Sequence, residues 1–150
     1  MPHFVIQILA NGSSIIILFK IIGMKIENIK FRAKRLDNGE WVEGDLNRST
    51  SYVGIGYPSS EFPDVPIVHR VNPDTVCQFT GLKDCDGNEI YEGDILKGDL
   101  NCEIVYTKGT FAAFSISYDK REYSYPLCYF VREDGTVDSK VAGNKFDKEK

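Results

Sequence analysis

Four carboxylates occupy matching places in two similar segments of this chain. Glu43 and Asp45 flank Gly44, and Glu92 and Asp94 flank Gly93. Carboxylates paired in this way could serve as an acid/base couple or bind a divalent cation. They could also be charged strand ends beside a glycine bulge, held by lysine and arginine. We favour the structural interpretation, because Lys30, Arg32 and Lys34 alternate along one face of a preceding segment.

Other chemistry-bearing patterns are incomplete. Asp84-x-Asp86-x-Asn88 is similar to the start of a calcium-binding EF-hand loop, but Glu89 stands where glycine is needed and Ile95 where a bidentate glutamate is needed. Turn chemistry explains these residues instead. The four cysteines are too widely spaced for a zinc site (Cys77, Cys85, Cys102 and Cys128). We expect reduced, mostly buried thiols in a cytoplasmic protein, and neither a metal nor a cofactor.

The acids belong to segments with the alternation typical of β-hairpins. The stretch around Asn38-Gly39 is repeated 49 positions later around Gly87-Asn88. Two-residue turns at these sites predict that Lys34 lies opposite Glu43, Arg32 opposite Asp45, and Lys83 opposite Glu92.

The remaining pattern predicts a mainly β fold, with antiparallel hairpins forming small barrel-like or sandwich lobes and little helix. Further strands are expected at 66–71, 76–82, 103–106, 110–118 and 127–131. The Gly/Pro/Ser-rich range 47–64 is predicted to be a mobile loop, and the domain is interpreted as two lobes at 24–71 and 72–144. The lysine-rich tail, 145–150, is expected to fray.

Residues 1–23 differ from the rest, with two apolar runs and one formal charge. They match neither a signal peptide nor a simple spanning helix. We interpret them as a leader that is not native, with Met24 as the natural start, or as an added β-hairpin turning at Asn11-Gly12. A membrane element is a third alternative, which we do not favour.

Aromatic residues are concentrated between 111 and 130. Exposed rings could stack on single-stranded bases, but few cations lie nearby and the net charge is -4. We therefore expect a core or protein interface, with Tyr123, Tyr125 and Tyr129 as candidate contact residues.

A longer pattern runs from Asn72-Pro73-Asp74 through Thr80-Gly81-Leu82 to Glu92-Gly93-Asp94 and Ile95. This run resembles the YopX family of phage and prophage proteins. Phe31-Arg32-Ala33 with the following Trp41, and the closing Val141-x-Gly143-Asn144, agree with it, so the similarity covers about 24–144. We expect the motif residues to be mainly structural: Trp41, Glu43, Gly44, Asp45, Thr80, Gly81, Leu82, Asp84, Gly87, Tyr91, Glu92, Gly93 and Asp94.

The resemblance implies a mainly β protein of mobile-element origin that self-associates, and it supplies no catalytic residue. No nucleophile motif or phosphate-binding loop is present in the sequence. We expect a non-enzymatic binding or assembly module with a phage or host protein as partner. The alternatives are a nucleic-acid accessory protein that uses the Lys30/Arg32/Lys34 face, and a metal-dependent hydrolase that uses the repeated carboxylates.

Overall fold

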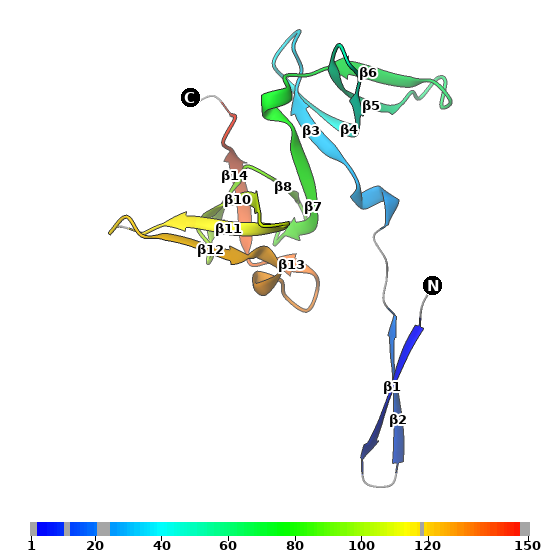
Figure 1. The fold of residues 1–150 in the computed structure, drawn as a ribbon, viewed down its shortest axis with the longest axis vertical. Helices are drawn as coiled ribbons and strands as arrows, with labels where there is room; N and C mark the ends of the chain where they lie inside the picture. The colour runs from blue at the N-terminus through cyan, green and yellow to red at the C-terminus, as the bar shows by residue number, and fades with distance from the viewer. Residues whose placement is uncertain (1–2, 11–12, 21–24, 118, 148–150) are drawn as a thin grey trace.

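The fold is mainly β, as predicted, and its only helical elements are short 3₁₀ turns in the described part of the chain (Figure 1). A computed structural model describes residues 3–10, 13–20, 25–117 and 119–147. The strands are β1 (His3–Ala10), β2 (Ser13–Lys20), β3 (Phe31–Lys34), β4 (Trp41–Arg48), β5 (Val53–Pro58), β6 (Pro66–Arg70), β7 (Cys77–Asp84), β8 (Glu89–Tyr91), β9 (Asp94–Gly98), β10 (Cys102–Thr107), β11 (Thr110–Ile116), β12 (Glu122–Pro126), β13 (Thr136–Val137) and β14 (Ser139–Asn144). Three short 3₁₀ turns accompany them: η1 (Ile26–Asn28), η2 (Pro73–Thr75) and η3 (Leu127–Phe130).

Two main sheets make up the body in a sandwich-like arrangement. The larger has the order β13-β7-β3-β4-β5-β6, with β8 also paired to β7. The smaller has the order β12-β11-β10-β9-β14. Pairing is antiparallel except between β13 and β7. The β11–β12 hairpin projects away from the rest of the molecule (Figure 1).

The hairpins form where the sequence predicts them, but their predicted register is wrong. Arg32 lies opposite Glu43, and Lys34 lies opposite Trp41. The loop closes on the pair Arg35 and Glu40, and the backbone N–H of Glu40 binds the Asn38 side chain. This loop therefore has four residues between its closing pair, and not two.

The second hairpin also has a longer loop than predicted. Lys83 lies opposite Glu89, and not opposite Glu92. The loop closes on Asp84 and Asn88 with Gly87 in the left-handed region, as is common in three-residue hairpin loops. The two loops differ in length by one residue. The two similar segments therefore do not place equivalent residues opposite each other.

The predicted loop 47–64 contains a strand, β5, so that prediction is wrong for 53–58. Glycines in β5 signal a loop from the sequence, but here they allow close strand contact. A Cβ on Gly44 would run into the carbonyl oxygen of Gly56, and the φ of Gly44 is +156°. Gly44 is therefore required by packing between β4 and β5. In β5, a Cβ on Gly54 would lie 3.1 Å from the carbonyl oxygen of His69, so this glycine allows the close approach of β6.

Two further predictions are wrong near the C-terminus. The strand predicted at 127–131 is the turn η3, and the strand β12 lies just before it. The tail is not frayed at 145–147, because Phe146 packs against the core and Asp147 binds Trp41. The rest of the predicted tail, 148–150, lies outside the described residues.

Hydrophobic residues form separate clusters under the two sheets. One is built on the smaller sheet with β8, β13 and η3 around Ile90, Leu96, Ile104 and Leu127. Another lies under β3–β5 around Ala33 and Ile55. Of the cysteines, Cys77 and Cys102 are buried but Cys85 and Cys128 are exposed, and all four are free thiols. Burial of the thiols is therefore correct for two of the four.

The first segment forms a two-stranded sheet of its own. Strands β1 and β2 pair antiparallel, with Ala10 opposite Ser13. This is the hairpin geometry expected if the segment is an added strand pair. In the described part of the chain, no helix has the length and apolarity needed to cross a membrane.

Candidate functional site

Several of the predicted motif residues meet where the two sheets join. Arg32 on β3 of the larger sheet forms an ion pair with Asp94 on β9 of the smaller sheet. The Asp94 side chain is fully buried, and its other hydrogen bonds come from the Asn144 side chain (3.0 Å) and the Tyr91 backbone N–H (2.8 Å). Burial raises the pKa of the Asp94 carboxyl, and the Asn144, Tyr91 and Arg32 contacts oppose that rise. These buried polar contacts connect the two sheets, and we call such a set of polar contacts between distant segments a tie.

Two aromatic rings lie close to the Arg32 guanidinium. Its carbon lies 4.4 Å from the centre of the Tyr91 ring and 4.9 Å from that of Trp41. Arginine suits such a position because its planar group stacks on rings while it donates to a carboxylate. Its buried Nε atom has no hydrogen-bond partner among the residues that the structure describes. The contacts of the guanidinium are thus its packing against the two rings and its ion pair with Asp94.

Beside this tie, Lys30 bridges two glutamates. Its ammonium lies 2.6 Å from Glu89 and 3.1 Å from Glu43, and the Tyr91 hydroxyl donates to Glu89 (3.0 Å). Burial acts to lower the pKa of Lys30, but the hydrogen bonds to Glu89 and Glu43 outweigh it and raise that pKa. Burial and the same two glutamates raise the pKa of the Tyr91 hydroxyl. A carboxylate held by an ammonium in this way is a poor general base, because the cation stabilises its ionised form.

Asp84 forms a second tie. Its carboxylate, fully buried at the end of β7, accepts four hydrogen bonds. They come from the backbone N–H groups of Asp86, Asn88 and Val141 and from the Asn88 side chain, at 2.8–3.1 Å. Burial acts to raise the pKa of Asp84, but these hydrogen bonds outweigh it and lower that pKa. The residues that are similar to a calcium loop therefore close a turn and join β7 to β14.

Trp41 forms a third tie, between β4 and the segment after β14. Its indole N–H donates to Asp147 at 2.8 Å, and the Lys34 ammonium lies 3.7 Å from the same carboxylate. The other Asp147 oxygen accepts the backbone N–H of Asn144 at 2.7 Å. The C-terminal segment is thereby fixed against the larger sheet.

The other motif residues support the backbone at β4, β7 and the loops. Thr80 donates to the carbonyl of Ile90, and Leu82 packs on the cluster under the smaller sheet. The carbonyl of Glu92 accepts from Asn144, whereas Asp45 is exposed at a hollow beside β5. All four motif glycines have positive φ: Gly44, Gly81, Gly87 and Gly93. In the part of the chain that the structure describes, no three His, Cys, Asp or Glu side chains are grouped to hold a metal.

The candidate contact tyrosines lie far from these ties, on or just after β12. Tyr123 and Tyr125 are exposed on one face of the strand, and Tyr129 is exposed on η3. Tyr106 of β10 is also exposed on the Tyr125 side and packs against Phe111. We call Tyr106, Tyr123 and Tyr125 the tyrosine face.

The sequence predicts that basic residues of the first hairpin pair with motif acids, but the predicted pairs are wrong. Arg32 pairs with Asp94, which is 62 positions away, and not with Asp45 across a hairpin. Asn144 and Asp147 were not recognised as parts of the ties. The signal that could have identified Asn144 is its place in the closing segment of the family pattern.

The ties all fall inside a region with a known family pattern. A family model described as "YopX protein" matches residues 30–148. No match was found among curated proteins or among solved structures. The matched region holds every residue of the three ties, from Arg32 to Asp147, and most of the chain. The chain belongs to the YopX family.

Proposed function

We propose that this protein is a non-enzymatic binding and assembly module, of phage or prophage origin, that works in the cytoplasm and self-associates through the tyrosine face. The observation that supports this most is a contrast between two surfaces. Glu43, Asp84 and Asp94 of the motif are bound by cations or N–H groups, whereas large aromatic side chains are left in contact with water.

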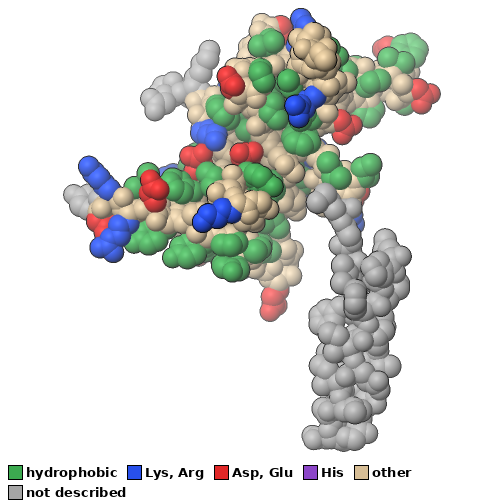
Figure 2. Space-filling view, viewed as in Figure 1, with side chains coloured by type: hydrophobic (Ala, Val, Ile, Leu, Met, Phe, Trp, Pro, Cys, Tyr) green, Lys and Arg blue, Asp and Glu red, His purple; other side chains and the backbone are tan. Residues whose placement is uncertain are grey.

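The tyrosine face has the composition of a protein contact. Tyr106 is 55% exposed and Tyr125 is 51% exposed, on strands β10 and β12, which lie on either side of β11 in the smaller sheet. Hydrophobic side chains gather along the lower side of this projecting part (Figure 2). Tyrosine is enriched at interfaces because it has a large apolar body and a polar tip that tolerates water.

The charged surfaces give less support to the alternatives. A nucleic-acid role was expected to use Lys30, Arg32 and Lys34, and each of these has a carboxylate within 4 Å. Cations that are already neutralised release few counterions from phosphate, so they add little affinity. A hydrolase role was expected to use the repeated acids, and Lys30 and Arg32 hold Glu43 and Asp94.

The test is the molar mass in solution, measured by light scattering over a range of concentrations. We expect the wild-type chain to associate, and a Tyr123→Ser/Tyr125→Ser variant to associate at least tenfold more weakly, because buried tyrosines are frequent interface hot spots. Phe62→Ser, at an exposed aromatic residue in the β5–β6 loop, is the matched control and should leave association unchanged. A wild-type chain that is monomeric at every concentration would contradict the proposal, as would a double variant that associates normally.

A further inference from the structure

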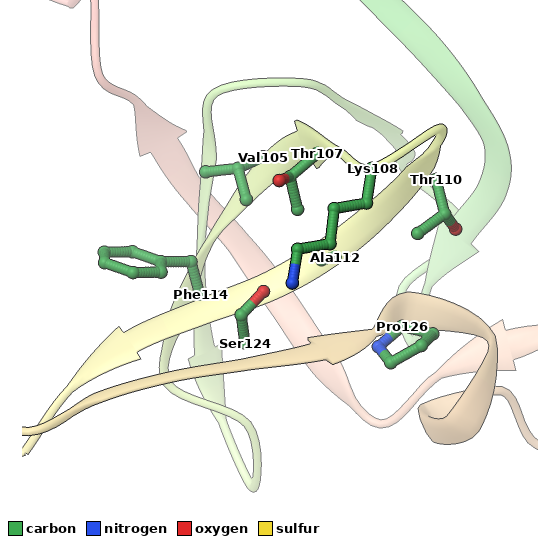
Figure 3. Close-up of a pocket in the computed structure, with 8 residues that line it drawn as sticks. All are labelled: Val105, Thr107, Lys108, Thr110, Ala112, Phe114, Ser124 and Pro126. Atoms are coloured by element: carbon green, nitrogen blue, oxygen red, sulfur yellow. The ribbon is translucent and has the colours of Figure 1, made fainter.

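A hollow lies on the face of β10–β12 opposite the tyrosine face. Its volume is about 480 Å³, and its lining is mostly apolar, with hydroxyl groups at the rim. The register places one set of alternate side chains here and the tyrosines on the other side. Its lining residues are Val105, Thr107, Thr110, Ala112, Phe114, Ser124 and Pro126, together with Lys108 (Figure 3).

Lys108 brings a positive charge into this apolar hollow. Its side chain extends over Ala112 in the direction of Ser124 (Figure 3). No carboxylate of the described residues lies within ion-pair distance of it, unlike the cations at the sheet junction. A lone ammonium beside apolar walls favours a ligand that has both an apolar part and a carboxylate.

The backbone of Lys108 also has an uncommon conformation. Its φ is +50°, in the left-handed region that glycine and asparagine adopt more readily. Lys120, at the tip of the next hairpin, has the same property, with a φ of +62°, but does not line the hollow. Lysine is therefore a costly choice for the turn at Lys108, and the turn directs its side chain over the hollow.

The edge of the sheet beside the hollow is open to another strand. Among the described strands, β12 is the last of its sheet and pairs only with β11. The N–H of Ser117 donates to the carbonyl of Arg121, so these two residues form a hydrogen-bonded pair. In an antiparallel hairpin such pairs alternate with pairs that are not hydrogen-bonded. By that alternation, the backbone groups of Glu122, Ser124 and Pro126 point away from β11. Ser124 thus offers one N–H and one carbonyl, and Pro126 offers a carbonyl only.

We propose that β12 and this hollow bind an extended peptide, which adds to the sheet as a further strand and places a carboxylate on Lys108. Peptides are recognised in this mode by main-chain hydrogen bonds, with pockets for alternate side chains. Neighbouring strands lie about 4.8 Å apart, so a strand beside β12 is roughly 10 Å from β11. An acidic side chain crossing Ser124 from one side, and the four-carbon stem of Lys108 from the other, can cover that span.

The carboxylate could belong to a side chain or to the peptide's C-terminus. Both would make the same contact with the ammonium, so the experiment must separate them. The binding surface is on the opposite face from the tyrosine face, and therefore this proposal does not depend on self-association through those tyrosines. A second copy of this chain could also pair along β12, which the experiment distinguishes as well.

Three variants separate the parts of the proposed site. Lys108→Asn removes the charge and keeps a residue that tolerates positive φ. Lys120→Asn is the matched control, since it makes the same change at a turn outside the hollow. Ser124→Pro removes an outward N–H together with the Ser124 hydroxyl. It removes no N–H that faces β11, so it blocks strand addition without breaking the β11–β12 ladder. Circular dichroism and unfolding curves check that each variant is folded.

The probes are two random twelve-residue peptide libraries, one with the C-terminus fused to a carrier and one with it free. If the carboxylate belongs to a side chain, we expect wild-type protein to select peptides rich in Asp or Glu from both libraries. If it is the C-terminus, we expect binding peptides from the second library alone. Synthetic copies should bind Lys108→Asn about tenfold more weakly or worse, because a charge-assisted hydrogen bond is lost. They should bind Lys120→Asn normally and Ser124→Pro not at all.

Three results would overturn the proposal. The first is that neither library yields a binding peptide. The second is that the selected peptides bind Lys108→Asn or Ser124→Pro as tightly as wild type. The third is a wild-type dimer that Ser124→Pro abolishes and that no peptide displaces, because this would assign the edge to a second copy.

Discussion

Replacing Asp84 by Asn tests whether this motif carboxylate is a structural group. The amide keeps one acceptor oxygen and puts an NH₂ group where the other oxygen was. Each Asp84 oxygen accepts two hydrogen bonds, so two N–H donors would lose their partner. Because Asp84 is fully buried, water cannot replace that partner.

The cost follows from these contacts. A lost hydrogen bond to a charged group costs roughly 1.5 kcal/mol or more, so two of them give about 3 kcal/mol. That is a large share of the roughly 5–15 kcal/mol by which a domain of this kind is stable. With a urea m-value of about 2 kcal/mol/M, the unfolding midpoint should fall by about 1.5 M.

The assay is equilibrium unfolding in urea, followed by the fluorescence of Trp41, the only tryptophan. Asp64→Asn, at an exposed aspartate, is the control and should change stability by less than about 0.5 kcal/mol. A loss below about 1 kcal/mol for Asp84→Asn would refute the reasoning.

The pH dependence gives an independent check. The hydrogen bonds to Asp84 hold its pKa in the folded protein below the usual value of 3.8. A carboxyl with a lowered pKa stabilises the fold fully above its unfolded pKa, and that contribution is lost as pH falls through the folded pKa. The stability gap between wild type and Asp84→Asn should therefore be the same at pH 7 and pH 5 and shrink below about pH 4.

Three further predictions follow from packing and burial. Gly44→Ala should lower the free energy of unfolding in urea by about 1–3 kcal/mol, because the new Cβ would meet a backbone carbonyl. Gly56→Ala is the control and should lower it less, because its Cβ would make an ordinary contact at 3.4 Å. Equal losses would contradict the packing argument. A chain that begins at Met24 should have a free energy of unfolding within about 0.5 kcal/mol of that of the full chain, because among the described strands β1 and β2 pair only with each other. A larger loss would show that this segment stabilises the two main sheets. At pH 8 a thiol reagent should label the exposed Cys85 and Cys128 quickly. It should label Cys77 and Cys102 only on unfolding, because burial shields these thiols and raises the pKa of each to about 11. Rapid labelling of all four cysteines would contradict the described burial.

Alternation and turn residues were enough to predict the fold class and most strands. The segments around β3, β4, β7, β10 and β11 follow the period of two that a half-buried strand requires. The strand β5 was missed because glycine usually weakens a strand, and its role here depends on a neighbouring backbone that the local sequence does not reveal.

Register and long-range partners could not be predicted in the same way. One residue more or less in a loop changes which side chains face each other. Asn38 and Asp84 bind backbone groups in their loops and so set the loop lengths, which an Asn-Gly or Gly-Asn pair alone does not specify. The pairing of Arg32 with Asp94 depends on how the two sheets meet, and no periodic pattern carries that information.

The central claim is that the charged motif residues join the sheets and are not reactive groups. A double-mutant cycle of Arg32→Met and Asp94→Asn, with the free energy of unfolding measured by circular dichroism, tests it most directly. Removing one member of a buried pair should cost about 3–5 kcal/mol, and the double variant should lose at least about 2 kcal/mol less than the sum of the single losses. Single losses below about 1 kcal/mol, or losses that simply add, would contradict the claim.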